Sequence, residues 1–292
     1  MAGRILVTGA DGFLGRVLAQ SLPPERLRLV DRRRPDLAGA ECIAADLTDA
    51  AALPDLLEGI ETIIHLAALP GGAAETDPGA SRAINLDASL NLIAAASGRA
   101  RFVYASSIAV FGAPLPERID DATPPSPAMT YGAHKAMVEI ALADAIRRGD
   151  IEGIALRLPG IVARPAAPSG LKSAFLSDLF RAIRDGTPFV LPVGPDSTVW
   201  LMSAACAAGN LIRALDVPSG AAITLPALRA TIADLVDAIA QGRPARIHYE
   251  PDPDLEAQFG RQPPLATARA DALGFRHDGD LATLIQNVWS HL

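Results

Sequence analysis

The strongest constraint on the fold lies near the start of the chain, where an apolar run ends in a glycine-rich loop. The run Arg4–Val7 leads directly into TGADGFLG at 8–15, a GxxGxxG pattern followed by a helical segment. A strand, a tight glycine turn and a helix in this order place free N–H groups and the positive end of a helix dipole where phosphates bind. The alternative is a glycine turn that binds no ligand. We expect a pyrophosphate site built from Gly9, Asp11, Gly12, Phe13, Leu14 and Gly15.

Apolar runs and helical runs alternate along the first half of the chain. Several of the apolar runs are apolar at nearly every position, which is typical of strands buried on both faces of a parallel sheet. The pattern predicts an α/β fold with a doubly wound parallel sheet, the Rossmann arrangement. Strands are predicted at Arg4–Val7, Leu27–Val30, Glu41–Ala44, Thr62–Leu66, Arg101–Ala105 and Ile154–Leu158, and helices at Gly12–Ser21, Ala50–Leu57, Gly79–Ser97 and Thr130–Arg148.

The alternation breaks after the last of these strands. The stretch from Pro159 to Gly170 is rich in proline and glycine and is not expected to be regular throughout. We expect residues 1–160 to form a nucleotide-binding domain and residues 161–292 to form mainly a small substrate lobe, with the segment 197–225 returning to the first domain. Further helices are predicted at Ala174–Arg184, Ala204–Leu215, Ile232–Ala240 and Asp280–Ser290, and a strand at Ser197–Met202.

Composition excludes several classes of function. Half of the 292 residues are apolar, and the net charge of −7 disfavours nucleic acids and anionic membranes as partners. The only cysteines, Cys42 and Cys206, exclude a disulfide framework and a cysteine-built metal site and are expected to be buried. No histidine or carboxylate spacing predicts a metal site. The longest uncharged run, 197–212, is too short and too polar to span a bilayer, and no targeting segment is visible, so we expect a cytoplasmic protein.

Two acidic positions are candidates for contacts with the nucleoside part of a dinucleotide. Asp31 ends the second predicted strand, about 20 residues beyond the glycine loop, where a carboxylate accepts hydrogen bonds from both ribose hydroxyls and repels a 2′-phosphate. This favours NAD over NADP, although the following Arg32–Arg34 would suit a phosphate. Asp46 and Leu47, after the third predicted strand, are placed to meet the adenine. The alternatives are a solvated strand-end acid for Asp31 and a helix-capping run ahead of the next helix for Asp46.

Tyr131 and Lys135 begin the long predicted helix with the spacing YxxxK, which puts both side chains on one helical face. A tyrosine is a poor base near neutral pH, but a neighbouring ammonium favours its phenolate. Tyr131 is therefore a candidate to take a proton from a substrate hydroxyl as a hydride leaves the same carbon. The pair stands out because this chain has only two lysines. Ser107, after a predicted strand, is the candidate to bind the reacting oxygen, with Ser106 as its competitor.

These segments together resemble the extended short-chain dehydrogenase/reductase family. The resemblance rests on TGADGFLG at 8–15, DL at 46–47, HLAA at 65–68, NLDAS at 85–89, SSIAVFG at 106–112 and YGAHK at 131–135, in the family's order. It implies that Ser107, Tyr131 and Lys135 are catalytic, that the cofactor is NAD, and that Tyr131 and Lys135 also touch it. It further implies that Leu66, Ala67 and Ala68 line the cofactor, that Asn85 orders the nicotinamide side, and that Pro159 packs on the carboxamide end. Phe111 departs from the usual tyrosine, which removes a hydroxyl from the loop but no catalytic group.

Within the family, the segments 101–107, 156–165 and 200–203 resemble members that oxidise a small sugar acid. A small C-terminal lobe also fits a four-carbon acid better than a nucleotide sugar. A buried carboxylate needs a partner, and arginine is the usual one. Arg164 is the candidate, with Lys172 as the runner-up and loop anchoring as the alternative role. Two other functions stay open: an NAD-dependent epimerase or dehydratase acting on a nucleotide sugar, and a catalytically silent dinucleotide sensor.

Two predicted helical segments, Leu86–Ala96 and Ala136–Ile146, are apolar on more than one face. A helix that only covers a sheet needs a single apolar stripe. The surplus predicts a two-fold homodimer, which the resemblance also implies, and burial under the C-terminal lobe is the alternative. His134 is expected at the surface or an interface, and His65 in the core or facing the cofactor.

Overall fold

The computed structural model describes residues 3–112, 114–164 and 174–292. Its centre is a seven-stranded sheet with the order β10-β6-β5-β4-β1-β2-β3, and every pairing in it is parallel. The order of the first six strands is that of a doubly wound dinucleotide-binding sheet. The strands are β1 (Arg4–Thr8), β2 (Leu27–Asp31), β3 (Glu41–Ala44), β4 (Ile60–His65), β5 (Arg101–Ser107), β6 (Gly153–Leu158) and β10 (Ile223–Thr224).

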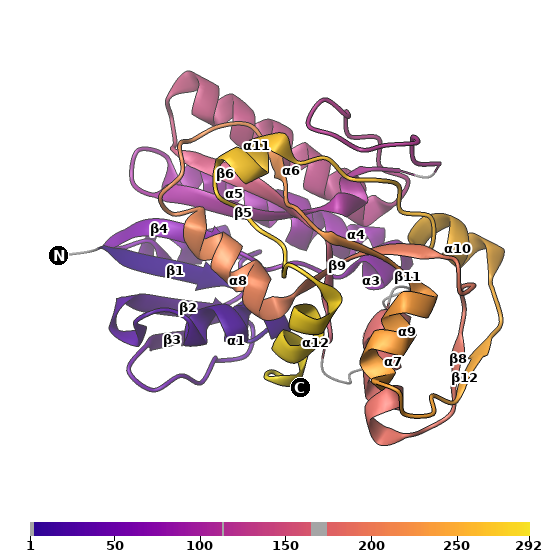
Figure 1. Ribbon diagram of the computed structural model, residues 1–292. Helices are drawn as coiled ribbons and strands as arrows, with labels where there is room; N and C mark the ends of the chain where they lie inside the picture. The colour runs from indigo at the N-terminus through magenta and orange to yellow at the C-terminus, as the bar shows by residue number, and fades with distance from the viewer. Residues whose placement is uncertain (1–2, 113, 165–173) are drawn as a thin grey trace.

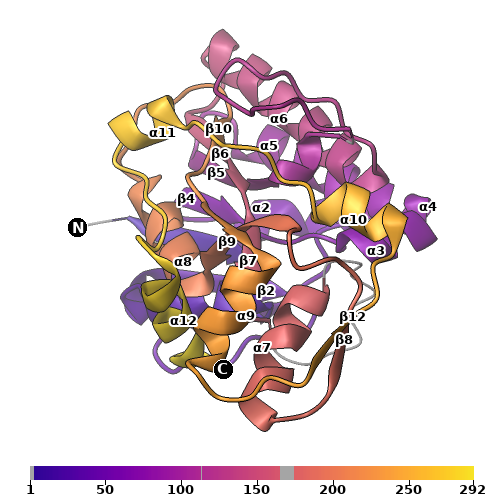
Figure 2. The ribbon, with the colours of Figure 1, turned by 45° about the vertical axis from the view of Figure 1, so that its right-hand side comes forward.

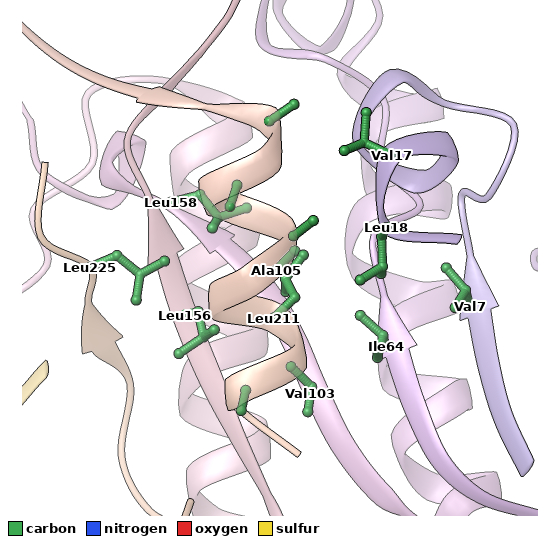
Figure 3. Close-up of a cluster of buried hydrophobic side chains, with 14 of the residues drawn as sticks. Val7, Val17, Leu18, Ile64, Val103, Ala105, Leu156, Leu158, Leu211 and Leu225 are labelled. Carbon is green, nitrogen blue, oxygen red and sulfur yellow. The ribbon is translucent and has the colours of Figure 1, made fainter. Parts of the chain in front are cut away.

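Helices cover both faces of this sheet (Figure 1). On one face α1 (Phe13–Gln20) packs beside α8 (Ala204–Arg213), and Figure 3 shows the apolar side chains between these helices and the strands. On the other face a second apolar cluster joins α5 (Ala88–Ala96) and α6 (Thr130–Arg148) to the strands. Burial on both faces confirms the two-sided apolar pattern of the predicted strands.

A third apolar core is enclosed by elements outside the large sheet, whose ribbons are shown in Figure 2. It joins a three-stranded sheet to three helices, α7 (Phe175–Asp185), α9 (Ile232–Ala240) and α12 (Leu281–Trp289). The strands of that sheet are β11 (Leu228–Thr231), β9 (Thr198–Ser203) and β7 (Gly160–Val162). The segment 197–225 is divided between the two parts, since β9 belongs to the small sheet whereas α8 and β10 join the large one. The two-domain division stays our interpretation.

Several short elements were not expected from the sequence. They are α3 (Gly71–Thr76), α10 (Pro253–Phe259), α11 (Ala268–Ala272), β7, β10, β11, and the parallel pair β8 (Phe189–Leu191) and β12 (Ile247–Tyr249). A short α2 (Leu53–Leu56) occupies the predicted helix 50–57. The helix predicted as one piece at 79–97 is found as α4 (Pro78–Ser81) and α5, separated by a π-helical turn at Arg82–Asp87.

Three expectations about single residues need correction. His134 lies in the core, 8% exposed, with its Nδ1 2.9 Å from the Ser81 hydroxyl, because the short α3–α4 segment covers this side of α6. Cys42 and Cys206 are free thiols, and both are only partly buried. Both sit at the margin of the cluster between α1 and α8 rather than within it.

Candidate active site

The glycine loop between β1 and α1 is built to receive a phosphate group. Gly9 has φ +70, and a Cβ there would lie 2.7 Å from the backbone nitrogen of Ala67, so only glycine fits. A Cβ on Gly15 would lie 2.7 Å from the Ala10 Cα, which keeps α1 close to β1. Gly12 is exposed and caps α1 without a side-chain hydrogen bond, so the first N–H groups of the helix need an outside partner. This cradle fits the pyrophosphate of a dinucleotide.

Asp31 lies at the mouth of this cradle, at the end of β2. Its carboxylate accepts hydrogen bonds from the backbone N–H groups of Asp11, at 3.0 Å, and Arg32, at 2.7 Å. The side chain of Asp11 in turn forms ion pairs with Arg16 and with Arg33, each at 2.6 Å. The Arg33 guanidinium, which would suit a 2′-phosphate, is therefore drawn to the carboxylate of the glycine loop.

Asp46 and Leu47 follow β3 at the surface. The Asp46 carboxylate accepts hydrogen bonds from the backbone and the hydroxyl of Thr48, and these bonds hold its pKa below its ordinary value. Asp46 therefore stabilises a local turn, while the adjacent helical turn is capped by Asp49. Leu47 is half-buried. The structure shows the local turn for Asp46, and its contact with adenine stays a prediction.

A buried hydrogen-bond chain holds the segment after β4. The His65 ring is hydrogen-bonded to the Thr8 hydroxyl, at 2.6 Å, and to the Ser89 hydroxyl, at 2.9 Å, and burial lowers the His65 pKa to about 3, so the ring is neutral. Asn85 accepts from the Leu69 N–H at 2.7 Å and donates to its carbonyl at 3.0 Å. Both ends of the half-buried segment Leu66–Ala68 are thereby fixed, and Asn85 acts on it through the backbone.

Tyr131, Lys135 and Ser107 meet where β5 ends against the first turns of α6. The Lys135 Nζ lies 5.6 Å from the Tyr131 ring centroid and 4.6 Å from that of Tyr104 in β5. It donates a 2.7 Å hydrogen bond to the Ala105 carbonyl and is only 2% exposed. The Ser107 hydroxyl lies beside Tyr131 and accepts from the Ala109 N–H at 3.1 Å.

Burial and a second cation both act on the charges of this centre. Burial raises the pKa of Tyr131, while the charge of Arg164 and the Ser107 hydroxyl lower it. Burial also lowers the pKa of Lys135 to about 7, against the raising effect of Glu139. Arg164 is thus a cation near Tyr131 that the sequence argument did not place there. The prediction that Lys135 also favours the Tyr131 phenolate stays a prediction.

Ser106, the alternative to Ser107, binds a residue of α6 instead of facing Tyr131. Its hydroxyl donates a 2.5 Å hydrogen bond to Glu139 of α6, and it is 2% exposed. Glu139 also forms a buried ion pair with Arg157 of β6, at 2.8 Å, and the Arg157 guanidinium lies 5.1 Å from the Phe111 ring centroid. Our sequence reasoning missed Glu139 and Arg157. An acid one helical turn after the lysine was the available signal.

Arg164 follows β7 and is partly buried. Its backbone N–H donates to the Ser177 hydroxyl at 3.0 Å, and its carbonyl accepts from the Arg181 guanidinium. These bonds anchor the backbone, so the side chain of Arg164 is not needed for that purpose. Burial lowers the pKa of its guanidinium and the Tyr131 phenolate raises it. Pro159 is buried between β6 and β7, and Lys172 lies outside the described residues.

Comparison with known proteins defines the class of this site. Residues 5–201 match the NAD dependent epimerase/dehydratase family, and the chain belongs to that family. It is an extended short-chain dehydrogenase/reductase and an NAD-dependent oxidoreductase.

In the described residues, no group of three histidine, cysteine or acidic side chains is placed to hold a metal ion. None of the described helices is long and apolar enough to cross a membrane.

Two curated proteins and one solved structure are similar to this chain over nearly its whole length. The D-erythronate dehydrogenases of Haemophilus influenzae and Cupriavidus necator are each 32% identical to this chain; the alignments cover 97% of it and 98% and 96% of those proteins. The crystal structure of a nucleoside-diphosphate-sugar epimerase from Agrobacterium tumefaciens is 33% identical, with a TM-score of 0.89 over 98% of this chain and 93% of that one.

Proposed function

We propose that this protein oxidises the C2 hydroxyl of D-erythronate to give 2-oxo-D-erythronate, with NAD as the oxidant. The observation that carries the proposal is the meeting of three groups: the Tyr131 hydroxyl, the Ser107 hydroxyl and the Arg164 guanidinium. A proton acceptor, an oxygen-binding hydroxyl and a carboxylate-binding cation are what oxidation of a 2-hydroxy acid needs. The two D-erythronate dehydrogenase relatives, aligned over 97% of the chain, support this substrate.

The oxidation breaks one C–H and one O–H bond and forms a C=O bond. NAD, when bound, supplies the acceptor of the hydride that leaves the carbon. Tyr131 takes the hydroxyl proton, and Ser107 donates a hydrogen bond to the reacting oxygen. Arg164 binds the carboxylate through two charge-assisted hydrogen bonds and lowers the pKa of Tyr131. Lys135, as an ammonium, orients the ribose hydroxyls.

The preference for NAD over NADP is assigned to Asp31. Its carboxylate ends β2 beside the glycine loop, where it would accept hydrogen bonds from the ribose hydroxyls and repel a 2′-phosphate. Gly9, Gly12 and Gly15, with the N-terminus of α1, would hold the pyrophosphate. Leu66, Ala67 and Ala68 would line the cofactor, and Pro159 would pack on its carboxamide end.

The test is NADH formation by the purified protein on a panel of sugar acids and nucleotide sugars. We expect D-erythronate to be oxidised with the highest kcat/KM and L-erythronate, the mirror-image acid, far more slowly. No NADH from any sugar acid at saturating NAD would contradict the proposal.

The second candidate is an NAD-dependent epimerase or dehydratase acting on a nucleotide sugar, and the Agrobacterium tumefaciens structure at 33% identity favours it. Such an enzyme would convert the nucleotide sugar with no net NADH and would retain its cofactor through purification. The same panel therefore separates the two candidates. A silent sensor is disfavoured because Ser107, Tyr131 and Lys135 are all present.

We further propose that the protein acts as a cytoplasmic homodimer. Two of its exposed large apolar side chains, Met137 at 49% and Ile140 at 69% exposure, lie one turn apart on the outer face of α6. A second copy would cover this stripe around a two-fold axis. Ile140→Glu should convert a dimer to a monomer in multi-angle light scattering. Val190→Glu, at another exposed apolar position, should leave the dimer intact, and a wild-type monomer at micromolar concentration would contradict the proposal.

A further inference from the structure

Glu139 is a buried carboxylate beside the reaction centre. It follows Tyr131 and Lys135 at successive four-residue steps along α6, so all three side chains share one face of the helix. Only 5% of Glu139 is exposed. A carboxylate removed from water to this degree needs strong partners, because desolvation disfavours the charged form.

Its partners come from the two strands that carry other parts of the site. Arg157 of β6 donates from Nε, at 3.0 Å and 3.1 Å, and from Nη2, at 2.8 Å, while Ser106 of β5 donates at 2.5 Å. Ser106 and Arg157 are opposite each other in the β5–β6 register, and the next pair is Ser107 and Leu158. One carboxylate thus connects the strand that ends in Ser107, the strand that leads to Pro159, and the helix of Tyr131 and Lys135.

Glu139 also bears on the charge of Lys135. The ammonium faces Tyr104 on β5, His65 on β4, and Tyr131 and Glu139 on α6. Two further cations act on these neighbours. Arg157 on β6 is paired with Glu139, and Arg164, after β7, lowers the pKa of Tyr131. Burial lowers the Lys135 pKa to about 7, and the charge of Glu139 raises it. The Ala105 carbonyl accepts a 2.7 Å hydrogen bond from the ammonium, but it carries no full negative charge.

We propose that Glu139 is a positioning residue of the reaction centre: its carboxylate ties α6 to β5 and β6 and supplies the negative charge that keeps Lys135 an ammonium. Arg157 balances that charge through its ion pair with Glu139. The effect of Glu139 on the pH profile of kcat/KM rests on the proposed dehydrogenase function. The effect of Glu139 on the charge of Lys135 does not.

The single variants Glu139→Gln and Arg157→Gln separate this role from simple packing. Each breaks the same ion pair, so a merely structural role predicts similar damage from both. The electrostatic role predicts opposite signs. Glu139→Gln leaves an unpaired cation near Lys135 and should lower its pKa, whereas Arg157→Gln leaves an unpaired anion and should raise it, each by about one unit.

The scarcity of lysine makes this pKa directly measurable. The chain has only two lysines, so selective ¹³C labelling of the lysine ε carbons yields two NMR signals, and Lys172→Arg leaves that of Lys135 alone. The signal is followed against pH in the free protein, which requires neither cofactor nor substrate. Shifts of opposite sign support the inference. Shifts of the same sign, or none, overturn it.

The double variant Glu139→Gln/Arg157→Gln is the safeguard if a single variant does not fold, because it leaves no unpaired buried charge. It removes Glu139, whose charge acts on Lys135, together with Arg157, which is paired with Glu139, so the Lys135 pKa should fall, but by less than in Glu139→Gln. An unchanged or raised pKa in the double variant overturns the inference.

A kinetic experiment measures kcat/KM for sugar-acid oxidation against pH and follows the acid limb of that profile. In Glu139→Gln the acid limb should move to lower pH, because the unpaired Arg157 cation favours proton loss from both Tyr131 and Lys135. In Arg157→Gln it should move to higher pH, because the unpaired Glu139 anion has the opposite effect. If the wild-type chain oxidises no sugar acid, the proposed function fails, while the NMR measurement still decides the role of Glu139.

Discussion

Replacement of Arg164 by methionine should produce two separable losses. The Arg164 guanidinium lowers the pKa of Tyr131, so its removal raises that pKa and weakens the proton acceptor for every alcohol. The same guanidinium is the proposed partner of the substrate carboxylate, so its removal also causes a loss that only an acid substrate suffers.

The two losses have different magnitudes and different pH dependence. Truncating one member of a buried, hydrogen-bonded charge pair costs about 3 kcal/mol, which is about a hundredfold in kcat/KM for the acid. The loss through Tyr131 is common to acid and polyol. Since a raised tyrosine pKa moves the acid limb of the pH profile to higher pH, this common loss is largest at low pH, but it cancels in the ratio of kcat/KM for the acid to kcat/KM for the polyol at each pH.

The assay is kcat/KM for D-erythronate and for erythritol, the matching neutral polyol, followed by NADH absorbance from about pH 7 to about 10. At each pH, Arg164→Met should lower the ratio of kcat/KM for the acid to kcat/KM for the polyol by about a hundredfold. Arg184→Met is the matched control, because Arg184 is an exposed arginine paired with Asp185 on α7.

An equal loss on both substrates at every pH, which leaves their ratio unchanged, would refute the carboxylate role of Arg164. A loss common to both substrates is already predicted through Tyr131, so only the ratio of acid to polyol tests that role.

Three further outcomes follow from the site. Tyr131→Phe removes the proton acceptor and should lower turnover about a hundredfold or more with nearly unchanged NAD binding by calorimetry; near-normal turnover would contradict its role. The Lys135 pKa falls on folding from 10.5 to about 7, so between these pH values the unfolded chain binds more protons than the folded protein. In urea unfolding, the free energy of unfolding of the wild type should therefore rise with pH relative to that of Lys135→Met, by up to about 1.4 kcal/mol per pH unit. A difference between the two proteins that stays constant with pH would refute the burial argument. Gly9 and Gly59 both have φ +70, but only at Gly9 would a new Cβ meet neighbouring backbone. Gly9→Ala should therefore lose more thermal stability than Gly59→Ala, and it should also lose NAD binding. Equal effects of the two variants would show that φ alone matters.

Local patterns predicted the parts of the fold that depend on neighbours in the chain. The helix Thr130–Arg148 is found with its predicted bounds, because its sequence is strongly helical and Gly149 ends it in the left-handed conformation. Short elements such as β7 and β10 were missed. A strand of two or three residues carries too little periodicity, and its neighbours in the sheet supply the pairing.

The α/β class, the glycine cradle and the grouping of Tyr131 with Lys135 could be predicted from the sequence. The first follows from the alternation of apolar and helical runs, and the other two depend on residues within one or two turns of one another. The charges at the centre could not be predicted in this way. Desolvation of Lys135, the effect of Arg164 on Tyr131, and the Glu139 ion pair with Arg157 all join segments far apart in the chain. Burial and Coulomb interactions depend on distance in space, which a one-dimensional pattern does not contain.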